Sequence, residues 1–340
     1  TSGHMESYMR AMAGILEYAR ITDKRELIEW GKRVFDYAQQ FSEGYTREEM
    51  GGATEAEIFE KLKRGDRLSS RFQRGFGWYP EHVVVESGSE ACSNVWILFC
   101  AYQLIQAGYP EYWDIVYRIN RNHLVETQLR DVSWLPHGAK GDSGEKAAGN
   151  VAESFKGMFA GWCDPNDFVG RRMAGPSATQ MMGCCDLTGL GYYLAWRHVV
   201  HRDAKGVWIN FAYNRESKWV RIRSHEPYEG KVEIDVYDAP VIFVRTPDWV
   251  NKKTVKVTVE GTSATLDWNG NYLHLSGLTP GQQVVIRYPL REMTCHVRVG
   301  GGWYDVEWKG NTVVGISPRG ACHPLYQREK YKANKAPLVT

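Results

Sequence analysis

The chain has 340 residues, a length that predicts about two domains. Its 42 Lys and Arg nearly balance its 40 Asp and Glu, which leaves a net charge of +2. This balance argues against a nucleic-acid-binding protein and against a polybasic membrane protein. No apolar run reaches the ~18 residues of a membrane span, and no signal peptide is visible, so we favour a cytoplasmic location.

The number and spacing of the cysteines indicate whether the chain is held together by disulfides. The sequence contains seven cysteines, an odd number. Two of them, Cys184 and Cys185, are adjacent, and adjacent cysteines seldom bridge each other because the ring that they would close is strained. We therefore expect reduced thiols or a metal site, and not a disulfide framework.

The first part of the chain has the periodicity of helices. Apolar residues recur at i, i+3 and i+4, and they predict one helix over about 5–19 and a second that starts near Asp23. Thr54 followed by Glu57 has the pattern of another helix start. These segments predict helical hairpins in the N-terminal part.

Further helices are expected before residue 203. Residues 87–90 predict the start of a helix that ends at Gly108, and Pro110 predicts the start of the next. The stretch 131–176 is rich in Gly, Ser, Pro and Asp and is expected to be mainly loop. A last helix is expected from about Asp186 to His198.

The pattern changes after residue 203. Short segments with β-branched and alternating residues follow, separated by turn signals such as Asn269-Gly270 and Pro280-Gly281. Strands at this spacing predict an antiparallel β-sandwich. We therefore predict an α+β multidomain protein, with a helical domain over 1–202 and a jelly-roll-like β-sandwich over 203–340.

Two short motifs could carry chemistry. Glu90-Ala91-Cys92 and the pair Cys184-Cys185 together supply one carboxylate and three sulfurs. Four such ligands complete a tetrahedral zinc site. The Cys-Cys pair lies just ahead of a predicted helix, and a helix N-terminus and a metal both lower the pKa of a thiol. The same arrangement would therefore prepare a nucleophile.

Each motif also has a plainer explanation. Ser87-x-x-Glu90 matches a capping box, in which Glu90 would bond a backbone N–H. Cys92 could be a small buried apolar residue. A closed site with four protein ligands is usually structural. Spacing alone leaves these alternatives open.

The two motifs, in this order, resemble the glycoside hydrolase family typified by β-L-arabinofuranosidases, formerly a domain family of unknown function. The likeness extends to GHMESYMRAMAGILEYA near the start, to YWDIVYRINRNHLVETQL after Glu-x-Cys and to VWINFAYNRESKWVRIRS at the first strands. It covers most of 1–300. The resemblance implies an (α/α)6-type helical barrel followed by β-sandwich domains. The helices before residue 203 supply only part of such a barrel, so we expect a divergent, N-terminally shortened member.

The resemblance also assigns the metal and the nucleophile. It implies that Zn²⁺ is held by Glu90, Cys92, Cys184 and Cys185. It further implies that Cys184 attacks the sugar and forms a thioglycosyl intermediate, with retention of configuration. Where the family has a proline after the cysteine pair, this chain has Asp186.

Other site residues follow from the same resemblance. His4 stands in the position of a histidine that contacts substrate, although Ser-Gly-His-Met also has the form of a tag remnant. The acid/base glutamate of the family lies ahead of Glu-x-Cys, where Glu81 is the first candidate and Glu86 the second. An exposed surface position is the alternative for both glutamates.

Three residues near Glu81 are candidates for substrate binding. Trp78 and Tyr79 lie in a Gly-rich turn and could stack on a sugar, and His82 could line the same cleft. Core packing is the alternative for the two rings.

The leading prediction is a zinc-dependent retaining glycosidase with a carbohydrate substrate, similar to a β-L-arabinofuranosidase. We expect no nucleic acid and no membrane partner. The alternative is a non-catalytic carbohydrate-binding or scaffolding protein with a structural zinc. A polysaccharide lyase or epimerase on an α/α barrel is a third possibility, but it would use Tyr and His instead of a Cys-Cys pair.

Overall fold

The structure is a computed structural model of the chain and describes residues 3–39, 57, 77–82, 85–135, 151–170, 187–299 and 302–337. The chain forms two units. The first comprises 1–192, 294–307 and 315–327, and the second comprises 193–293, 308–314 and 328–340. The division into independent domains at 202/203 stays a prediction.

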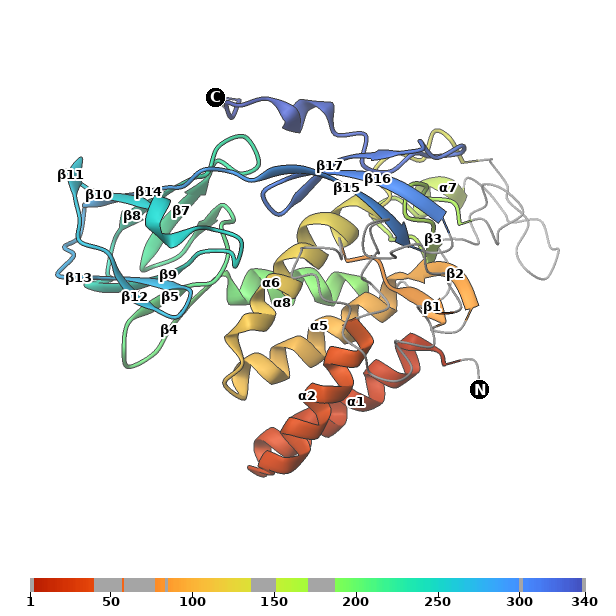
Figure 1. Ribbon diagram of the computed structural model, residues 1–340, viewed down its shortest axis with the longest axis horizontal. Helices are drawn as coiled ribbons and strands as arrows, with labels where there is room; N and C mark the ends of the chain where they lie inside the picture. The colour runs from red at the N-terminus through yellow and green to blue at the C-terminus, as the bar shows by residue number, and fades with distance from the viewer. Residues whose placement is uncertain are drawn as a thin grey trace. The chain divides into compact units, whose positions relative to one another are not determined.

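Helices form a large part of the first unit (Figure 1). The predicted helices near residues 5, 23 and 110 are confirmed, as are the helix that ends before Gly108 and the helix near 186–198. The helix start at Thr54 lies outside the described residues. The helical elements are α1 (Met5–Ile21), α2 (Arg25–Gln39), α5 (Ala91–Gln106), η1 (Pro110–Tyr112), α6 (Trp113–Arg118), the π-helix η2 (Ile119–Leu124), α7 (Val151–Ser154) and α8 (Thr188–Val199).

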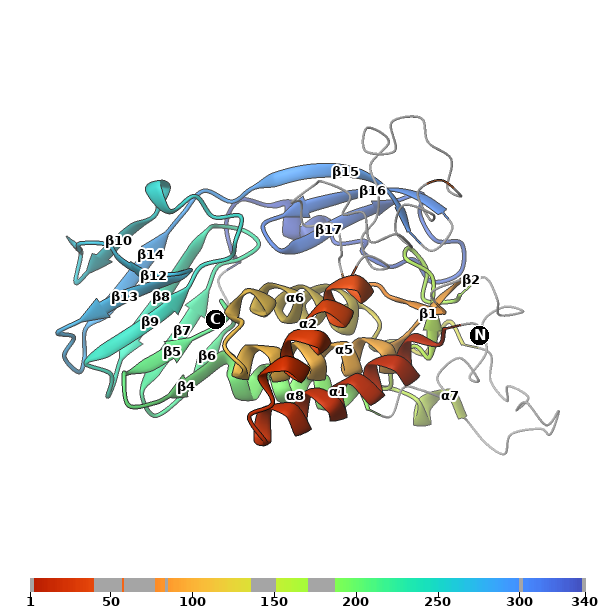
Figure 2. The ribbon, with the colours of Figure 1, turned by 60° about the horizontal axis from the view of Figure 1, so that its bottom comes forward.

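Helices α1 and α5 pack side by side in both views (Figure 2). The buried stripe of α1 includes Met9 and Leu16, at the helical spacing of an apolar face. The Cys100 thiol of α5 donates to the Met9 carbonyl oxygen at 3.3 Å. Near the other end, Arg20 Nε donates to Gln103 Oε1 at 2.8 Å. The two helices therefore run in the same direction.

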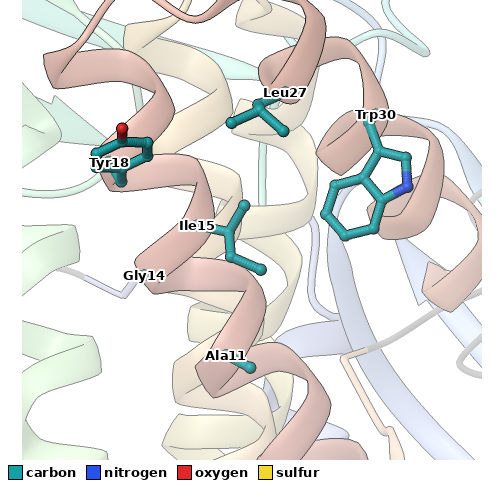
Figure 3. A pocket seen from close by; sticks show the side chains of 6 residues that line it. All are labelled: Ala11, Gly14, Ile15, Tyr18, Leu27 and Trp30. Atoms are coloured by element: carbon teal, nitrogen blue, oxygen red, sulfur yellow. The ribbon is translucent and has the colours of Figure 1, made fainter.

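The outer sides of α1 and α2 form a shallow apolar hollow (Figure 3). It is lined by Ala11, Gly14, Ile15, Tyr18, Leu27 and Trp30. Trp30 and Tyr18 are 40% and 56% exposed. The hollow lies on the side of α1 opposite Met9 and Leu16, and it contains no side chain with a formal charge.

A small antiparallel sheet lies at the start of α5. It has the order β1 (Pro80–His82), β2 (Val85–Glu90), β3 (Trp162–Cys163). The prediction that residues 87–90 open a helix is wrong, because Ser89 and Glu90 pair with Cys163 and Trp162 in the sheet. Helix α5 begins only at Ala91, and the Glu90 side chain makes no capping hydrogen bond.

Helix α8 packs against the start of α5. Tyr192 contacts a buried cluster that contains Ala91, the residue between Glu90 and Cys92. One residue earlier, a Cβ placed on Gly191 would lie 2.8 Å from Leu124 Cδ1 and 3.2 Å from Leu98 Cδ1. The absence of a side chain at Gly191 therefore lets α8 approach α5 and η2 closely.

Two larger sheets form most of the second unit and appear as separate layers in Figure 1. The predicted strands are confirmed, with further short strands between them. One sheet contains β11 (Thr262–Ser263), β10 (Lys256–Val259), β14 (Gln283–Arg287), β8 (Lys231–Val236), β7 (Val220–Ser224) and β6 (Arg215–Glu216), in that order. The other contains β12 (Asp267–Asn269), β13 (Tyr272–Ser276), β9 (Val241–Arg245), β5 (Val207–Ile209) and β4 (Val200–Arg202).

Strand pairing follows the sequence pattern with one exception. Residues of β8 alternate between buried and half-buried, as in a strand with one face on a core. The hairpin of β12 and β13 turns at Gly270, whose φ of +57° lies in the region that glycine tolerates best. The exception is β5, which runs parallel to β9, so this sheet is not entirely antiparallel as predicted.

A further sheet of β15 (Glu292–Val299), β16 (Gly302–Lys309) and β17 (Thr312–Ser317) follows, in that order. Residues 294–307 and 315–327 group with the helical unit. Here the Asp167 carboxylate accepts backbone N–H bonds from Cys322 and His323, at 2.7 and 2.9 Å. No helix in the described ranges combines the length and apolar character needed to cross a membrane.

Substituting Gly191 by Val should destabilise the helical unit. The added side chain would meet Leu124 and Leu98, both fully buried, and overpacking of this kind costs about 1–3 kcal/mol. Gly189→Val, on the same helix, is the control, because a Cβ there meets nothing within 4 Å. Urea unfolding would measure both variants, and equal stability would contradict the packing.

Candidate active site

Three polar side chains meet at one end of α1 and α5. One ligand atom of His4, one of Glu81 and one of Glu90 all lie within 4.8 Å of one another. His4 directly precedes α1, Glu81 lies on β1, and Glu90 is the last residue of β2. His4 Nε2 and Glu90 Oε2 are 2.9 Å apart. The fold therefore joins segments separated by almost 80 positions of the sequence.

The local structure explains why these residues meet. Strands β1 and β2 form an antiparallel pair in which Pro80 is opposite Ser89, with a register shift next to it. This pairing places Glu81 close to Glu90. The parallel packing of α1 on α5 then places His4 beside Glu90, because each residue directly precedes its helix. Both helix N-termini point at the cluster, and their dipoles favour negative charge there.

Glu90 is a buried carboxylate with several partners. Its side chain is 2% exposed. Trp162 Nε1, on the neighbouring strand β3, donates to Glu90 Oε1 at 3.1 Å. The other oxygen faces His4 Nε2, and the Cys92 thiol lies 3.7 Å from it. An isolated carboxylate is costly to bury, so this set of contacts is what allows Glu90 to be buried.

The His4 ring is oriented from its other nitrogen. His4 Nδ1 lies 2.9 Å from Ser7 Oγ and 3.7 Å from Glu6 Oε2, one turn into α1. A second partner of this kind fixes the ring so that Nε2 points at Glu90. His4 is 30% exposed whereas Glu90 is almost fully buried, so the cluster reaches from the protein interior to solvent.

The donor set is suited to a metal ion. Imidazole, carboxylate and thiolate are all zinc ligands. The 3.7 Å between Cys92 Sγ and Glu90 Oε2 is close to the ~3.5 Å edge of a tetrahedron with the usual zinc–sulfur and zinc–oxygen bonds. His4, Glu81 and Glu90 form a second candidate set within the same cluster.

Several predicted site residues are not described. Cys184 and Cys185 lie outside the described residues, as does Asp186. Glu86 lies on β2 and His82 on β1, but their side chains are outside the described set. Their predicted roles stay predictions.

Trp78 and Tyr79 lie in the core. They are 1% and 2% exposed. The Tyr79 hydroxyl donates to Gln39 Oε1 on α2. These contacts favour the packing alternative, and a stacking role for the two rings stays a prediction that needs them to be uncovered.

Two other thiols are structural. Cys100 and Cys163 are fully buried. Burial raises the pKa of each thiol, for Cys163 with a further contribution from the nearby Asp164 and Asp167. Both side chains therefore remain neutral thiols.

A buried polar group beneath the cluster was not predicted. His123 is fully buried, and burial lowers the pKa of its imidazole to about 3. Its Nε2 lies 3.0 Å from Ser89 Oγ. The hydrogen bond from Trp162 to Glu90 was not predicted either. Nothing in the sequence pairs residues 89–90 with 162–163, because that pairing depends on the formation of the sheet.

Comparison with known proteins supports a glycoside hydrolase fold. No protein-family model and no curated protein matches the chain. Among solved structures, a protein described as a glycoside hydrolase superposes with a TM-score of 0.52 at 14% identity, over 89% of this chain and 59% of that one.

More particularly, the fold is similar to that of GH127 β-L-arabinofuranosidases, which confirms the resemblance seen in the sequence. The GH127 β-L-arabinofuranosidase of Geobacillus stearothermophilus T6 gives a TM-score of 0.56 at 11% identity, over 92% of this chain and 46% of its own. A second GH127 β-arabinofuranosidase gives 0.54 at 15% identity, over 92% and 47%. The chain thus spans about half the length of these proteins.

Acidification should destabilise the protein through its buried histidines. Burial lowers the pKa to about 3 for His123 and to about 4 for His198, whereas unfolded histidine has a pKa of about 6.5. Below pH 6.5 the unfolded chain therefore binds protons that the folded chain does not. From pH 7 to about pH 5.5, each ring should lower the free energy of unfolding by about 1 kcal/mol.

The contribution of one ring can be isolated. His123→Gln removes the titrating group, so urea unfolding of this variant should lose about 1 kcal/mol less stability than the native chain over the same pH interval. An identical pH dependence in the two proteins would show that His123 does not make this contribution.

Proposed function

We propose that this protein is a zinc-dependent retaining glycosidase with a cysteine nucleophile, acting on a terminal sugar such as β-L-arabinofuranose. One observation carries the proposal. His4, Glu81, Glu90 and Cys92 converge at one place, and they do so in a fold similar to that of GH127 β-L-arabinofuranosidases. In this proposal, the helices belong to an (α/α)6-type barrel.

Glu90, Cys92, Cys184 and Cys185 would hold the zinc ion. The proximity of α8 to α5 supports the participation of the cysteine pair. Helix α8 begins at Thr188, three residues after Cys185, and a Cβ placed on Gly191 of α8 would lie 3.2 Å from Leu98 Cδ1 of α5. Glu90 and Cys92 lie at the start of the same helix α5.

Zinc would keep the Cys184 sulfur ionised and would lower its basicity. A thiolate is the reactive form of cysteine, and a less basic sulfur is also a better leaving group in the second step. Glu90 brings one negative charge to the site. The donation from Trp162 to its other oxygen keeps Oε2 directed at Cys92.

The reaction would proceed in two displacements. The Cys184 sulfur attacks the anomeric carbon, the bond to the leaving oxygen breaks, and Glu81 or Glu86 in its acid form protonates that oxygen. The resulting carboxylate then takes a proton from water. The water oxygen attacks the same carbon, and the carbon–sulfur bond breaks to return the thiolate. Configuration is retained because the carbon is inverted twice.

Glu81 is the better supported acid/base candidate. A carboxylate oxygen of Glu81 lies within 4.8 Å of His4 and Glu90, and Glu81 is half-buried at the edge of the cluster. His4, which is partly exposed, would contact the sugar in this proposal. A substrate role for His82, Trp78 and Tyr79 remains part of the proposal only if the chain around them opens.

Replacing the nucleophile tests the mechanism directly. Cys184→Ala should lower the hydrolysis of p-nitrophenyl β-L-arabinofuranoside by at least about 1,000-fold, because no covalent intermediate can form. Cys322→Ala is the matched control, since Cys322 is an exposed thiol on another segment. Zinc content, measured in parallel, should fall in the first variant only. Unchanged turnover would refute the nucleophile, and bound zinc without turnover in the native chain would favour a structural metal site.

Paired glutamate variants test the acid/base assignment. Glu81→Gln should slow the cleavage of substrates with poor leaving groups by about 100- to 10,000-fold. The effect on p-nitrophenyl glycosides in the first step should be smaller, because that leaving group needs little protonation. Glu86→Gln is compared under the same conditions. A larger effect at position 86 would transfer the role to Glu86.

A further inference from the structure

The sheet that carries Glu90 separates two faces. Ser89 pairs with Cys163 and Glu90 pairs with Trp162 across β2 and β3. Because successive side chains of a strand point to opposite faces, the two pairs must lie on different sides. The contacts agree: Glu90 and Trp162 bond each other on the side of His4, and Ser89 and Cys163 face His123.

His123 contacts β2 and β3 on the face opposite His4. It belongs to the π-helix η2, a type of helix frequently found at functional sites. Its Nε2 lies 3.0 Å from Ser89 Oγ and 3.8 Å from Cys163 Sγ. All of its described polar contacts are made through Nε2, since Nδ1 has no partner within the described part of the chain. The Nε2 atom of His123 is thus directed at strands β2 and β3.

Asn94 links this contact to the backbone of Glu90. Its amide Nδ2 lies 3.2 Å from His123 Nε2 and donates to Ser89 Oγ and to the Glu90 carbonyl oxygen, also at 3.2 Å. These two donations use both hydrogens of the amide, so Ser89 Oγ accepts from Asn94 and its own hydroxyl hydrogen can be donated to Nε2. The residue before Glu90 and Glu90 itself are therefore both held.

There is little room for the strands to move. A Cβ placed on Gly88 would lie 3.0 Å from the Cys163 carbonyl oxygen. Strands β2 and β3 therefore approach each other closely next to the contact between Ser89 and His123. Ser89, Asn94 and His123 are all fully buried. Removal of one partner from a buried hydrogen bond leaves the other partner unsatisfied, so loss of the His123 ring would favour a movement of β2 that restores partners for Ser89 and Asn94.

We propose that His123 is a positioning residue: its ring holds the Ser89–Cys163 pair as a clamp and thereby fixes the Glu90 carboxylate relative to Cys92 and His4. This inference rests on the proposed function only for what the fixed carboxylate holds. Loss of the clamp leaves the ligand residues intact but lets β2 move. Groups that orient a metal ligand in this way typically account for 10- to 100-fold in metal affinity.

Three variants test the clamp. His123→Met fills the space without a polar atom, whereas His123→Gln places a polar atom near the position of Nε2. Asn120→Leu is the matched control, because Asn120 is a buried polar residue of the same π-helix whose amide donates to the Val116 carbonyl oxygen. Two readouts are used: amide hydrogen exchange of the peptides that contain 85–92 and 162–163, and zinc affinity from competition with a chromophoric chelator.

If His123 holds β2 as proposed, His123→Met should have a local effect that is absent in His123→Gln. In His123→Met, exchange in these two peptides should rise at least tenfold and zinc affinity should fall 10- to 100-fold, while His123→Gln stays within about threefold of the native protein in both. Asn120→Leu should change neither. If His123→Met does not fold, His123→Asn replaces it, because its polar atom lies near Nδ1 and not near Nε2.

The outcomes separate this inference from the proposed function. Native exchange and affinity in His123→Met, or equal changes in all three variants, would overturn the clamp. A native protein that binds no zinc would overturn the proposed metal site, and the exchange measurements would still decide whether His123 holds β2.

Discussion

The buried carboxylate of Glu90 is the group on which the arrangement of the helical unit depends. A charge that is 2% exposed is stable only when neighbouring groups compensate for its lost hydration. Here two of those groups come from distant segments, since Trp162 donates from β3 and His4 lies directly before α1. The N-termini of α1 and α5 also point at the carboxylate. The carboxylate therefore adds polar contacts between α1, β3 and the start of α5, elements that also pack or pair through other groups.

The position of Glu90 between a strand and a helix gives its two neighbours different roles. Ser89 is still part of the sheet and faces the interior, where His123 and Asn94 hold it. Cys92 is already in the first turn of α5, which returns its sulfur to the same side as Glu90. One short segment thus contributes side chains to both faces of the sheet. The similarity to GH127 β-L-arabinofuranosidases, at 11–15% identity, extends over 92% of the chain.

Regular elements were predictable because their signals are local. The stripe of Met9, Met12 and Leu16 predicted α1, and alternation in 231–237 predicted β8. Glu90 and Cys92 could be identified as a pair because both lie within three residues. Segment 87–90 was assigned to a helix, since its capping pattern is a local signal, whereas its pairing with Trp162 and Cys163 is not. The parallel pairing of β5 with β9 was not predicted, because it too joins segments that are distant in the sequence.

The sequence by itself determined which side chains can take part in metal or acid/base chemistry, and which segments become helices or strands, because composition and periodicity act over a few residues. Tertiary structure alone decided which of them meet. It placed Glu81 and His4 beside Glu90, buried Trp78 and Tyr79 in the core, and put His123 beneath β2. These outcomes depend on strand register and helix packing, which arise from many weak contacts over the whole unit and leave no short motif.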